Sequence, residues 1–318
     1  MPLQYDPELA QIVEPFLRNL GGFPRQKLHD VEGRRAMLAN MFPQTTAPPS
    51  IPEDIEQIIH HVRASDEHEI AIYHIRKKTS SDRKPGPAIV HIHGGGYISL
   101  TAMSSINLLV AYVQQTGVPI LSIDYRLAPE HPYPVPFEDC WTSLQWIRSH
   151  ADELSIDLNR LAIMGESAGG GLAAGLTLMA RDRELSPPLA KQILIYPMID
   201  DRTRSNHAGQ LAMWDENDNE TGWTAYLGAD VGSDRVSPYA AAARTTSVEG
   251  LPPLYLDCGQ LDMFVHEDIE YVRRFVMANI PTDCHLYAGL PHGFEGLAPT
   301  STAVQQAFAN RVRAMKSF

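Results

Sequence analysis

The chain contains few cysteines, and this shortage excludes two classes of protein. Three cysteines among 318 residues cannot form a fully paired disulfide framework, as in small secreted domains. None of them has the spacing of a zinc site. We therefore expect Cys140, Cys258 and Cys284 to be small buried hydrophobic residues.

Positive charge is also scarce. Lys and Arg number 26 against 38 Asp and Glu, so the net charge is −12, and no run of basic residues is present. A polyanion would find no complementary surface on such a chain. The composition therefore argues against nucleic acid as a partner.

No long hydrophobic run occurs either. A membrane-spanning helix needs about 18 or more consecutive apolar residues, and no such window is found. The first eight residues are acidic and include two prolines, unlike the charged start and apolar stretch of a secretory signal. We expect a cytoplasmic protein with no stable membrane association.

Apolar residues are nevertheless plentiful. Hydrophobic residues make up 44% of the chain, including 12 Tyr, 9 Phe and 4 Trp, which is enough for a sizeable core. The length allows either one large α/β domain or two smaller domains. The composition therefore predicts a globular fold but does not fix the number of domains.

Short β-rich runs alternate with longer helical stretches from about residue 55 onward. Such alternation predicts right-handed crossovers and a mostly parallel sheet covered on both faces. The expected strands are an outer one at 70–75, buried ones at 88–93, 119–124, 160–165, 192–196 and 254–258, and a later one around 285–287. The expected helices cover 104–116, 137–150, 167–181 and 266–278.

Two segments differ from this alternating pattern. Residues 8–20 have apolar residues at helical spacing, although Pro15 is expected to kink or split that helix. Residues 200–230 show no clear strand and contain two tryptophans, so they are expected to form an insertion over the sheet edge. The proline-containing stretch 46–52 is interpreted as a connector.

The strongest motif is Gly165-Glu166-Ser167-Ala168-Gly169, between a predicted strand and a small-residue helix. This is the context of a nucleophile elbow, in which a strained turn exposes the serine hydroxyl. Glycines on both sides avoid collisions in the turn. The alternative is a glycine-rich turn with a passive serine. The matching context on both sides favours Ser167 as a nucleophile.

A second glycine motif, His93-Gly94-Gly95-Gly96-Tyr97, ends another predicted strand. Backbone amides aimed at a developing oxyanion can each stabilise a transition state by about 3 to 4 kcal/mol. We predict such donors at Gly95, Gly96 and Ala168, with Gly94 a weaker candidate. A phosphate-binding loop is the rival interpretation, but it would need a Lys and a Ser or Thr that are missing here.

A serine nucleophile needs a base and an acid that orients the base, and in this context both follow the serine in the chain. Asp262 follows the predicted strand 254–258, and His292 lies in Pro291-His292-Gly293-Phe294. Asp257, Glu267 and Asp268 compete for the acid role. We favour Asp262, with Glu267 second, because Asp257 lies within a strand and the others begin a helix.

Two histidines on one strand, His91 and His93, raise the question of a metal site. No Glu or Cys partner stands at a suitable spacing, so no metal ligand set is predicted. His93 is instead expected to anchor the oxyanion loop through a backbone hydrogen bond.

Together these motifs resemble the hormone-sensitive-lipase-like carboxylesterases, also called bacterial family IV, of the α/β-hydrolase superfamily. The resemblance extends over nearly the whole chain from about residue 50. The matching motifs are His93-Gly94-Gly95-Gly96-Tyr97, Asp124-Tyr125-Arg126-Leu127-Ala128-Pro129-Glu130, Gly165-Glu166-Ser167-Ala168-Gly169-Gly170, Ser237-Pro238 and Pro291-His292-Gly293-Phe294.

The resemblance implies an eight-stranded, mostly parallel sheet flanked by helices, with a helical cap. The cap would consist of residues 1–45 and 200–230, and the hydrolase core of 46–199 and 231–318. Family members mostly hydrolyse short- to medium-chain esters without a cofactor, so the implied partner is a small-molecule ester. A homodimer is left open.

The chain departs from the family pattern at two places. Glu166 stands where aspartate is common, and Asp262-Met263-Phe264 replaces a frequent Asp-Pro-Leu. Neither change removes a catalytic group, although the second could alter the loop that holds Asp262.

Several residues have both a functional and a structural interpretation. Tyr97, Trp214 and Trp223 are candidates for lining the substrate site, although aromatic residues in a covering segment are as often packing residues. Arg126 and Glu130 are expected to be structural and to fix a turn near the oxyanion loop.

The reaction class also has alternatives. Lactone or amide hydrolysis would use the same three residues. A non-catalytic receptor, similar to plant gibberellin receptors, is disfavoured because those receptors lack the histidine found here at position 292.

Overall fold

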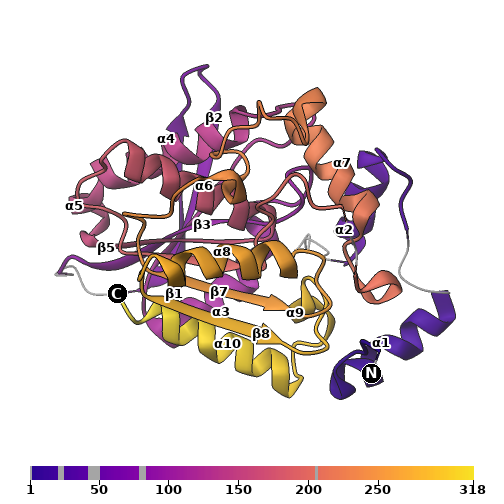
Figure 1. Cartoon of the computed structure of the whole chain (residues 1–318). Coiled ribbons are helices and arrows are strands. Elements are labelled where there is room, and N and C mark those ends of the chain that lie inside the picture. Colours follow the sequence, from indigo (N-terminus) through magenta and orange to yellow (C-terminus); the bar gives the residue numbers. More distant parts are fainter. Residues whose placement is uncertain (1, 21–24, 42–50, 79–83, 205–206) are drawn as a thin grey trace.

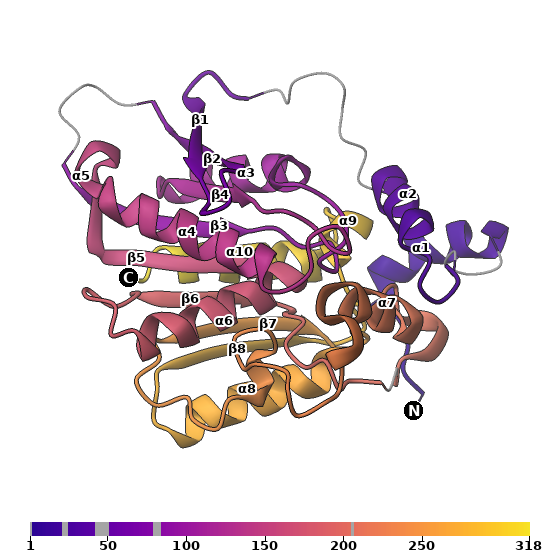
Figure 2. The same cartoon turned by 90° about the horizontal axis from the view of Figure 1, so that it is seen from above.

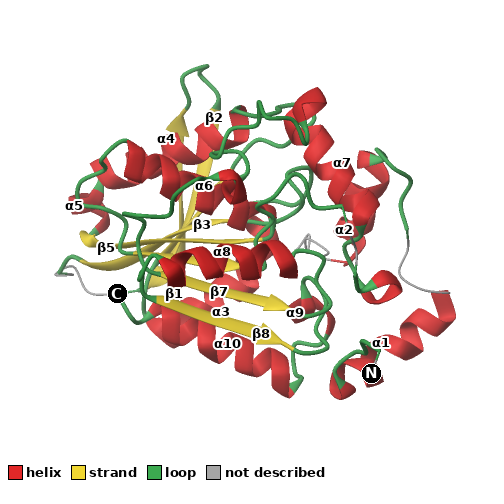
Figure 3. Cartoon of the chain, viewed as in Figure 1, coloured by secondary structure: helices red, strands yellow, loops and turns green. Residues whose placement is uncertain are grey.

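The structure, a computed structural model, describes residues 2–20, 25–41, 51–78, 84–204 and 207–318. A single eight-stranded sheet with the order β1-β2-β4-β3-β5-β6-β7-β8 forms its centre (Figures 1 and 3). Neighbouring strands are parallel from β4 across to β8, whereas β2 is antiparallel to β1 and β4. The predicted fold class is confirmed. The strands are β1 (Ile55–Arg63), β2 (Glu69–Lys77), β3 (Gly86–Ile92), β4 (Ile120–Asp124), β5 (Ile156–Glu166), β6 (Lys191–Ile195), β7 (Leu254–Gly259) and β8 (Thr282–Tyr287).

Helices cover both faces of this sheet. On one face α3 packs against α10, and on the other α4 packs against α6, with α8 over β7 and β8 (Figures 1 and 2). Strands covered on both sides are expected to be apolar along their length, and β7 is buried at every position. The longer core helices are α3 (Ile106–Thr116), α4 (Val135–Ser149), α6 (Ala168–Asp182), α8 (Val265–Met277) and α10 (Thr302–Met315), and the short ones are α5 (Ala151–Leu154) and α9 (Phe294–Leu297).

Each predicted strand overlaps an observed one, but β1 and α10 were not predicted. β1 is an edge strand that pairs only with β2, and its burial is irregular, so its sequence lacks a clear alternating pattern. The predicted burial of the cysteines is wrong for Cys284, which is exposed on β8, whereas Cys140 and Cys258 are buried.

Three helices gather at the carboxyl end of the sheet: α1 (Pro7–Leu20), α2 (Val31–Met41) and α7 (Glu216–Leu227) (Figure 2). α1 continues through Pro15, so the helix is not split there. The helices of the two segments predicted as a cap thus lie at the same end of the sheet (Figure 2), and the division into cap and core stays a prediction. The predicted connector at 46–52 falls largely outside the described residues.

α2 is fixed by two adjacent arginines that reach in different directions. Arg34 is fully buried and donates to Asp218 of α7 at 2.8 Å. Arg35 donates to the carbonyl oxygen of Ile98 at 2.8 Å and to both carboxylate oxygens of Glu130. Glu130 was expected to be structural, and its carboxylate connects α2 to the turn beside the oxyanion loop.

A buried charged cluster joins α10 to the sheet. Arg311, which is 1% exposed, donates to both oxygens of Asp257 at 2.7 and 2.9 Å and to Glu295 at 2.9 Å. Burial alone would raise the pKa of Glu295, but the adjacent Arg311 and a hydrogen bond from Tyr196 hold it below its usual value. A buried charge needs a partner of opposite charge, and here the Arg311 guanidinium pairs with the carboxylates of both Asp257 and Glu295.

Replacing Arg311 by alanine is therefore expected to lower the free energy of unfolding by about 3–5 kcal/mol, because the buried carboxylate of Asp257 and the half-buried one of Glu295 lose their cation. Urea unfolding followed by circular dichroism would measure the change. Arg313→Ala is the matched control, since Arg313 pairs with Asp283 at the surface and should contribute no more than about 1 kcal/mol. Equal losses in the two variants would contradict the assigned role of the buried cation.

Candidate active site

Three side chains from distant parts of the chain form one hydrogen-bonded row. His292 Nδ1 lies 2.6 Å from Asp262 Oδ2, and His292 Nε2 lies 2.9 Å from Ser167 Oγ. An ionised carboxylate can only accept, so Nδ1 donates to Asp262, and Nε2 is free to accept the serine proton. Asp262 is fully buried, while Ser167 and His292 are 7% and 6% exposed. The geometry is that of a serine nucleophile with its base and orienting acid.

The loop after β7 holds Asp262 firmly. Its second carboxylate oxygen accepts a hydrogen bond from the Phe264 amide at 3.0 Å. The Phe264 ring meets the His292 imidazole edge-on, with centroids 5.2 Å apart, and the Tyr196 ring does so at 4.6 Å. The Met263-Phe264 departure from the family pattern thus leaves the acid in reach of the base and supplies one wall for the imidazole.

Of the three competing acids, Asp268 has no hydrogen-bond partner for either carboxylate oxygen among the described residues, and the other two have partners other than His292. Asp257 pairs with Arg311, as described above. Glu267 accepts from the amides of Ile199 and Asp200 at 2.7 and 3.0 Å and from the Thr203 hydroxyl. Neither carboxylate is hydrogen-bonded to the imidazole of His292, so the structure favours Asp262 over its rivals.

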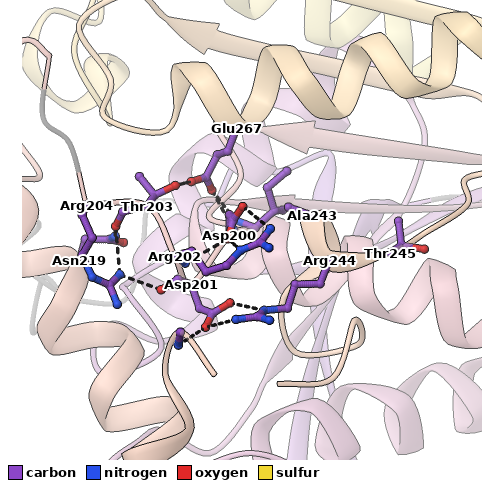
Figure 4. A network of polar contacts seen from close by, with 12 residues as sticks. Asp200, Asp201, Arg202, Thr203, Arg204, Asn219, Ala243, Arg244, Thr245 and Glu267 are labelled. Carbon is purple, nitrogen blue, oxygen red and sulfur yellow. Dashed lines mark hydrogen bonds and ion pairs between the residues drawn. The ribbon is translucent and has the colours of Figure 1, made fainter. Parts of the chain in front are cut away.

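Glu267 belongs to a polar network at the start of the 200–230 segment (Figure 4). In the same network Asp201 is fully buried and receives two hydrogen bonds from Arg244, at 2.6 and 2.9 Å. The carbonyl oxygen of Thr203 accepts from Asn219 of α7 at 2.9 Å. Burial raises the pKa of Glu267, while its three donors oppose that shift. This network fixes the segment to the core at the point where it leaves the sheet.

Ser167 occupies a sharp turn between β5 and α6. Its backbone has φ 53° and ψ −120°, an arrangement that costs a non-glycine residue about 1–3 kcal/mol. Beside this turn α6 packs directly against the end of β3. A Cβ on Gly169 would lie 2.1 Å from the carbonyl oxygen of Ile92. Only glycine lets α6 approach β3 this closely. The strand, turn and helix of a nucleophile elbow are all present.

The oxyanion loop follows β3 and is anchored as expected. His93 Nδ1 donates to the Gly94 carbonyl oxygen at 2.8 Å, and the ring stacks on Tyr125 with centroids 4.3 Å apart. Burial lowers the pKa of His93 to about 4, so its imidazole is neutral near pH 7. The loop is therefore held by a neutral ring that adds no charge beside the site.

The predicted oxyanion donors lie beside the nucleophile. Gly95 and Gly96 line the same cavity as Ser167, and Ala168 is the first residue of α6. Among the described residues, no hydrogen-bond acceptor is found for the amides of Gly95, Gly96 or Ala168. These groups are consequently available to a ligand, and the helix dipole adds positive potential at Ala168.

The side chain of Tyr97 does not line the cavity that contains Ser167. Its side chain is fully buried, its hydroxyl donates to the Met198 carbonyl oxygen at 3.0 Å, and its ring stacks on Tyr226. Tyr97 therefore belongs to the packing beneath the oxyanion loop, which corrects the prediction that it lines the substrate site. Trp223 is also fully buried and packs against Tyr97.

Trp214, in contrast, lies at the site. It lines the cavity, and a Cβ on Gly96 would come within 2.5 Å of its indole ring. Gly96 also has a positive φ of 63°. Glycine at this position thus serves both the turn and the close approach of the tryptophan.

A cavity of about 480 Å³ opens above Ser167. Leu38 of α2 lines it together with Met213 and Trp214, and α3 and α10 form another part of its wall. These two helices contribute apolar side chains from Leu108, Ala111, Val304 and Phe308 and polar ones from Asn107, Gln305 and Arg311. The sequence analysis considered Tyr97, Trp214 and Trp223 as lining residues and missed those of α3 and α10, because the latter follow the spacing of ordinary core helices.

In the part of the chain that the structure describes, no group of three or more His, Cys, Asp or Glu side chains is arranged to hold a metal ion. Within the same residues, no helix has the length and apolar character needed to cross a bilayer.

Comparisons with known proteins agree with this geometry. A family model described as an alpha/beta hydrolase fold matches residues 89–296. Carboxylesterase NlhH from Mycobacterium tuberculosis is 31% identical over 237 residues, covering 72% of this chain and 73% of that protein. Ethyl acetate hydrolase from Pseudomonas putida is 28% identical over 254 residues, covering 76% and 80%.

Relatives also include hormone-sensitive lipase from Bos taurus, which is 32% identical over 184 residues, or 57% of this chain and 21% of that protein. Among solved structures, a bacterial heroin esterase superposes with a TM-score of 0.88 and 32% sequence identity, over 98% of this chain and 97% of that one. The chain therefore belongs to the hormone-sensitive-lipase-like family of carboxylic ester hydrolases, within the α/β-hydrolase superfamily.

Proposed function

We propose that this chain is a serine carboxylesterase that hydrolyses short- to medium-chain esters through an acyl-enzyme intermediate. The observation that supports it best is the unbroken row from Ser167 Oγ through His292 to Asp262. Family membership and an apolar cavity above the serine add to this support.

In the first step Ser167 Oγ attacks the ester carbonyl carbon while His292 Nε2 takes the hydroxyl proton. The carbonyl π electrons move to oxygen, and the amides of Gly95, Gly96 and Ala168 stabilise the oxyanion. Collapse of this intermediate breaks the bond to the alkoxy group. The imidazolium gives its proton to the leaving alcohol, so charge and protons balance.

In the second step water replaces the alcohol. His292 takes a proton from the water as it attacks the acyl-enzyme carbonyl, and a second oxyanion forms at the same amides. Its collapse releases the carboxylic acid and returns the proton to Ser167. Asp262 keeps its charge throughout and stabilises the imidazolium in both steps.

An ester panel tests this proposal. Purified protein should hydrolyse p-nitrophenyl esters from acetate to octanoate faster than palmitate, and faster than lactones and amides of matched size. A preference for lactones or amides would replace the proposed ester class, since the same three residues can serve those bonds. If the protein hydrolysed no ester, lactone or amide, the result would contradict the proposal.

A fluorophosphonate probe distinguishes a hydrolase from a passive receptor. An activated serine beside free oxyanion donors should become covalently labelled, and mass spectrometry of the digested protein should locate the adduct on Ser167. A binding pocket that lacks a working base would not react.

Chain-length preference is expected to depend on α3. Ala111 lines the cavity between α3 and α10, so Ala111→Phe should fill this space. We expect kcat/KM for the octanoate ester to fall at least about tenfold relative to the acetate ester, since one excluded methylene can be worth that much. Gln114→Phe, on the exposed side of the same helix, is the matched control. An unchanged ratio in Ala111→Phe would show that the acyl chain lies elsewhere.

A further inference from the structure

Glu166, the residue immediately before the nucleophile, forms a buried contact that the proposed mechanism does not use. Its two carboxylate oxygens lie 3.0 and 2.8 Å from Nε2 of His91. The other imidazole nitrogen of His91 lies 2.8 Å from the Ser122 hydroxyl. His91 and Ser122 are fully buried, and Glu166 is 6% exposed. Since a carboxylate only accepts, Nε2 donates to Glu166.

The three residues form a row across adjacent strands. His91 on β3 is in register with Ser122 on β4 and with Met164 on β5. Side chains alternate along a strand, so Glu166, two residues after Met164, is on the same face as His91. The row therefore crosses three strands just below the loops that hold the candidate site.

The row connects the two loops whose relative position matters for acyl transfer. The β3–β5 ladder ends at the Ile92–Gly165 pair. Beyond it, β3 leads into the oxyanion loop and β5 into the elbow. The Glu166–His91 contact crosses between the strands at this end of the ladder.

We propose that Glu166 is a positioning residue that acts through His91 and sets the distance between the oxyanion amides and Ser167 Oγ. The inference rests on the proposed esterase function. It also accounts for the departure from the aspartate that is common in the family. Aspartate is shorter by one methylene, about 1.5 Å, so at this position it would fall short of His91. In this chain the length of the side chain at position 166 therefore determines whether the carboxylate contacts His91.

Reach and charge can be separated by two substitutions. Glu166→Asp keeps the charge but loses the reach, whereas Glu166→Gln keeps the reach and one acceptor oxygen. We expect kcat for p-nitrophenyl butyrate to fall about 100-fold in Glu166→Asp, the effect of roughly 1 Å of misplacement. In Glu166→Gln we expect a fall of less than about tenfold, with KM within about threefold of wild type in both.

Affinity for butylboronic acid, which forms a tetrahedral adduct with the serine, should fall in parallel with kcat because it depends on the same amides. Glu69→Asp is the matched control. Glu69 contacts His61 at 2.9 Å on the exposed surface, and this variant should retain wild-type turnover.

A His91→Leu background tests whether Glu166 acts through His91. There, glutamate and aspartate at position 166 should give the same kcat, because neither has an imidazole to contact. If His91→Leu does not fold, the contrast between Glu166→Asp and Glu166→Gln decides alone. Wild-type kcat in Glu166→Asp, a lower kcat in Glu166→Gln than in Glu166→Asp, or a change confined to KM would overturn the proposal.

The second-order rate of fluorophosphonate labelling keeps this test separate from the proposed function. Labelling requires the serine and the oxyanion amides to be in place but does not require ester turnover. If no ester is hydrolysed, the labelling rates should still follow the order wild type, Glu166→Gln, Glu166→Asp. An equal labelling rate in all three proteins would overturn the positioning role even where the esterase function holds.

Discussion

Ser167→Ala should lower kcat for p-nitrophenyl butyrate by about 10⁶-fold, the scale seen when a serine nucleophile is removed. Alanine keeps the backbone and fills nearly the same space, but it offers no atom to form the acyl-enzyme. The His292 imidazole would then lack the partner that it contacts at 2.9 Å. Residual activity would come from binding and the oxyanion amides alone. Initial rates at saturating ester would measure the loss.

A second serine provides the control for this substitution. Ser143 lies fully buried on α4 and is not among the residues that line the cavity. Ser143→Ala removes the same hydroxyl group from the core and should leave kcat near wild type. Circular dichroism of both variants would verify the fold. Undiminished turnover in Ser167→Ala, with the fold intact, would refute the assignment of the nucleophile.

Asp262→Asn should lower kcat by about 10⁴-fold while the fold is retained. The amide is nearly isosteric, but it no longer stabilises the imidazolium, and it can hold the imidazole in the wrong tautomer. The present contact between His292 Nδ1 and Asp262 Oδ2 is 2.6 Å. A pH profile of kcat/KM for the variant would report how the base titrates without its acid.

Asp268→Asn is a close control for the acid. Asp268 is fully buried, and burial raises the pKa of its carboxyl well above the usual value, which favours the uncharged form that asparagine resembles. Asparagine should replace it with little effect on kcat. A large loss in Asp268→Asn and a small one in Asp262→Asn would mean that the acid had been assigned to the wrong residue.

Much of the architecture could be predicted because the buried strands leave a direct signature. Continuous apolar runs such as β7 are recognisable in any parallel sheet. β1 was missed because it is an edge strand with one paired neighbour and an irregular burial pattern. Its stability comes from antiparallel pairing with β2, the next strand in the chain, rather than from an apolar pattern of its own.

The candidate catalytic residues were predictable for a different reason. Ser167, Asp262 and His292 each follow a strand, and parallel strands bring such loops to one edge of the sheet. The part of the cavity wall formed by α3 and α10 was not predictable, because those lining residues have the spacing of ordinary core residues. Tyr97 shows the opposite error, in which proximity to a motif suggested a substrate contact although its ring is buried below the loop.

The role of His91 was also missed, because from the sequence alone it was considered only as a metal ligand. Its partner is two strand positions beyond its register neighbour, on a strand more than 70 residues later in the chain. A pairing of this kind depends on register, which becomes visible only when β3 and β5 are placed side by side.

The location of the cavity has a consequence for how esterases of this kind could diversify. Where the structure describes them, the covering segments contribute Leu38, Met213 and Trp214 to its lining, while two helices of the central scaffold, α3 and α10, form another part of its wall. Under the proposed function, a chimera given a foreign lid should admit different alcohols yet retain its own acyl-length selectivity. Substitutions that accommodate longer acyl chains would fall on helices that also support the sheet. A change in acyl-length preference would therefore lower the thermal stability of the fold.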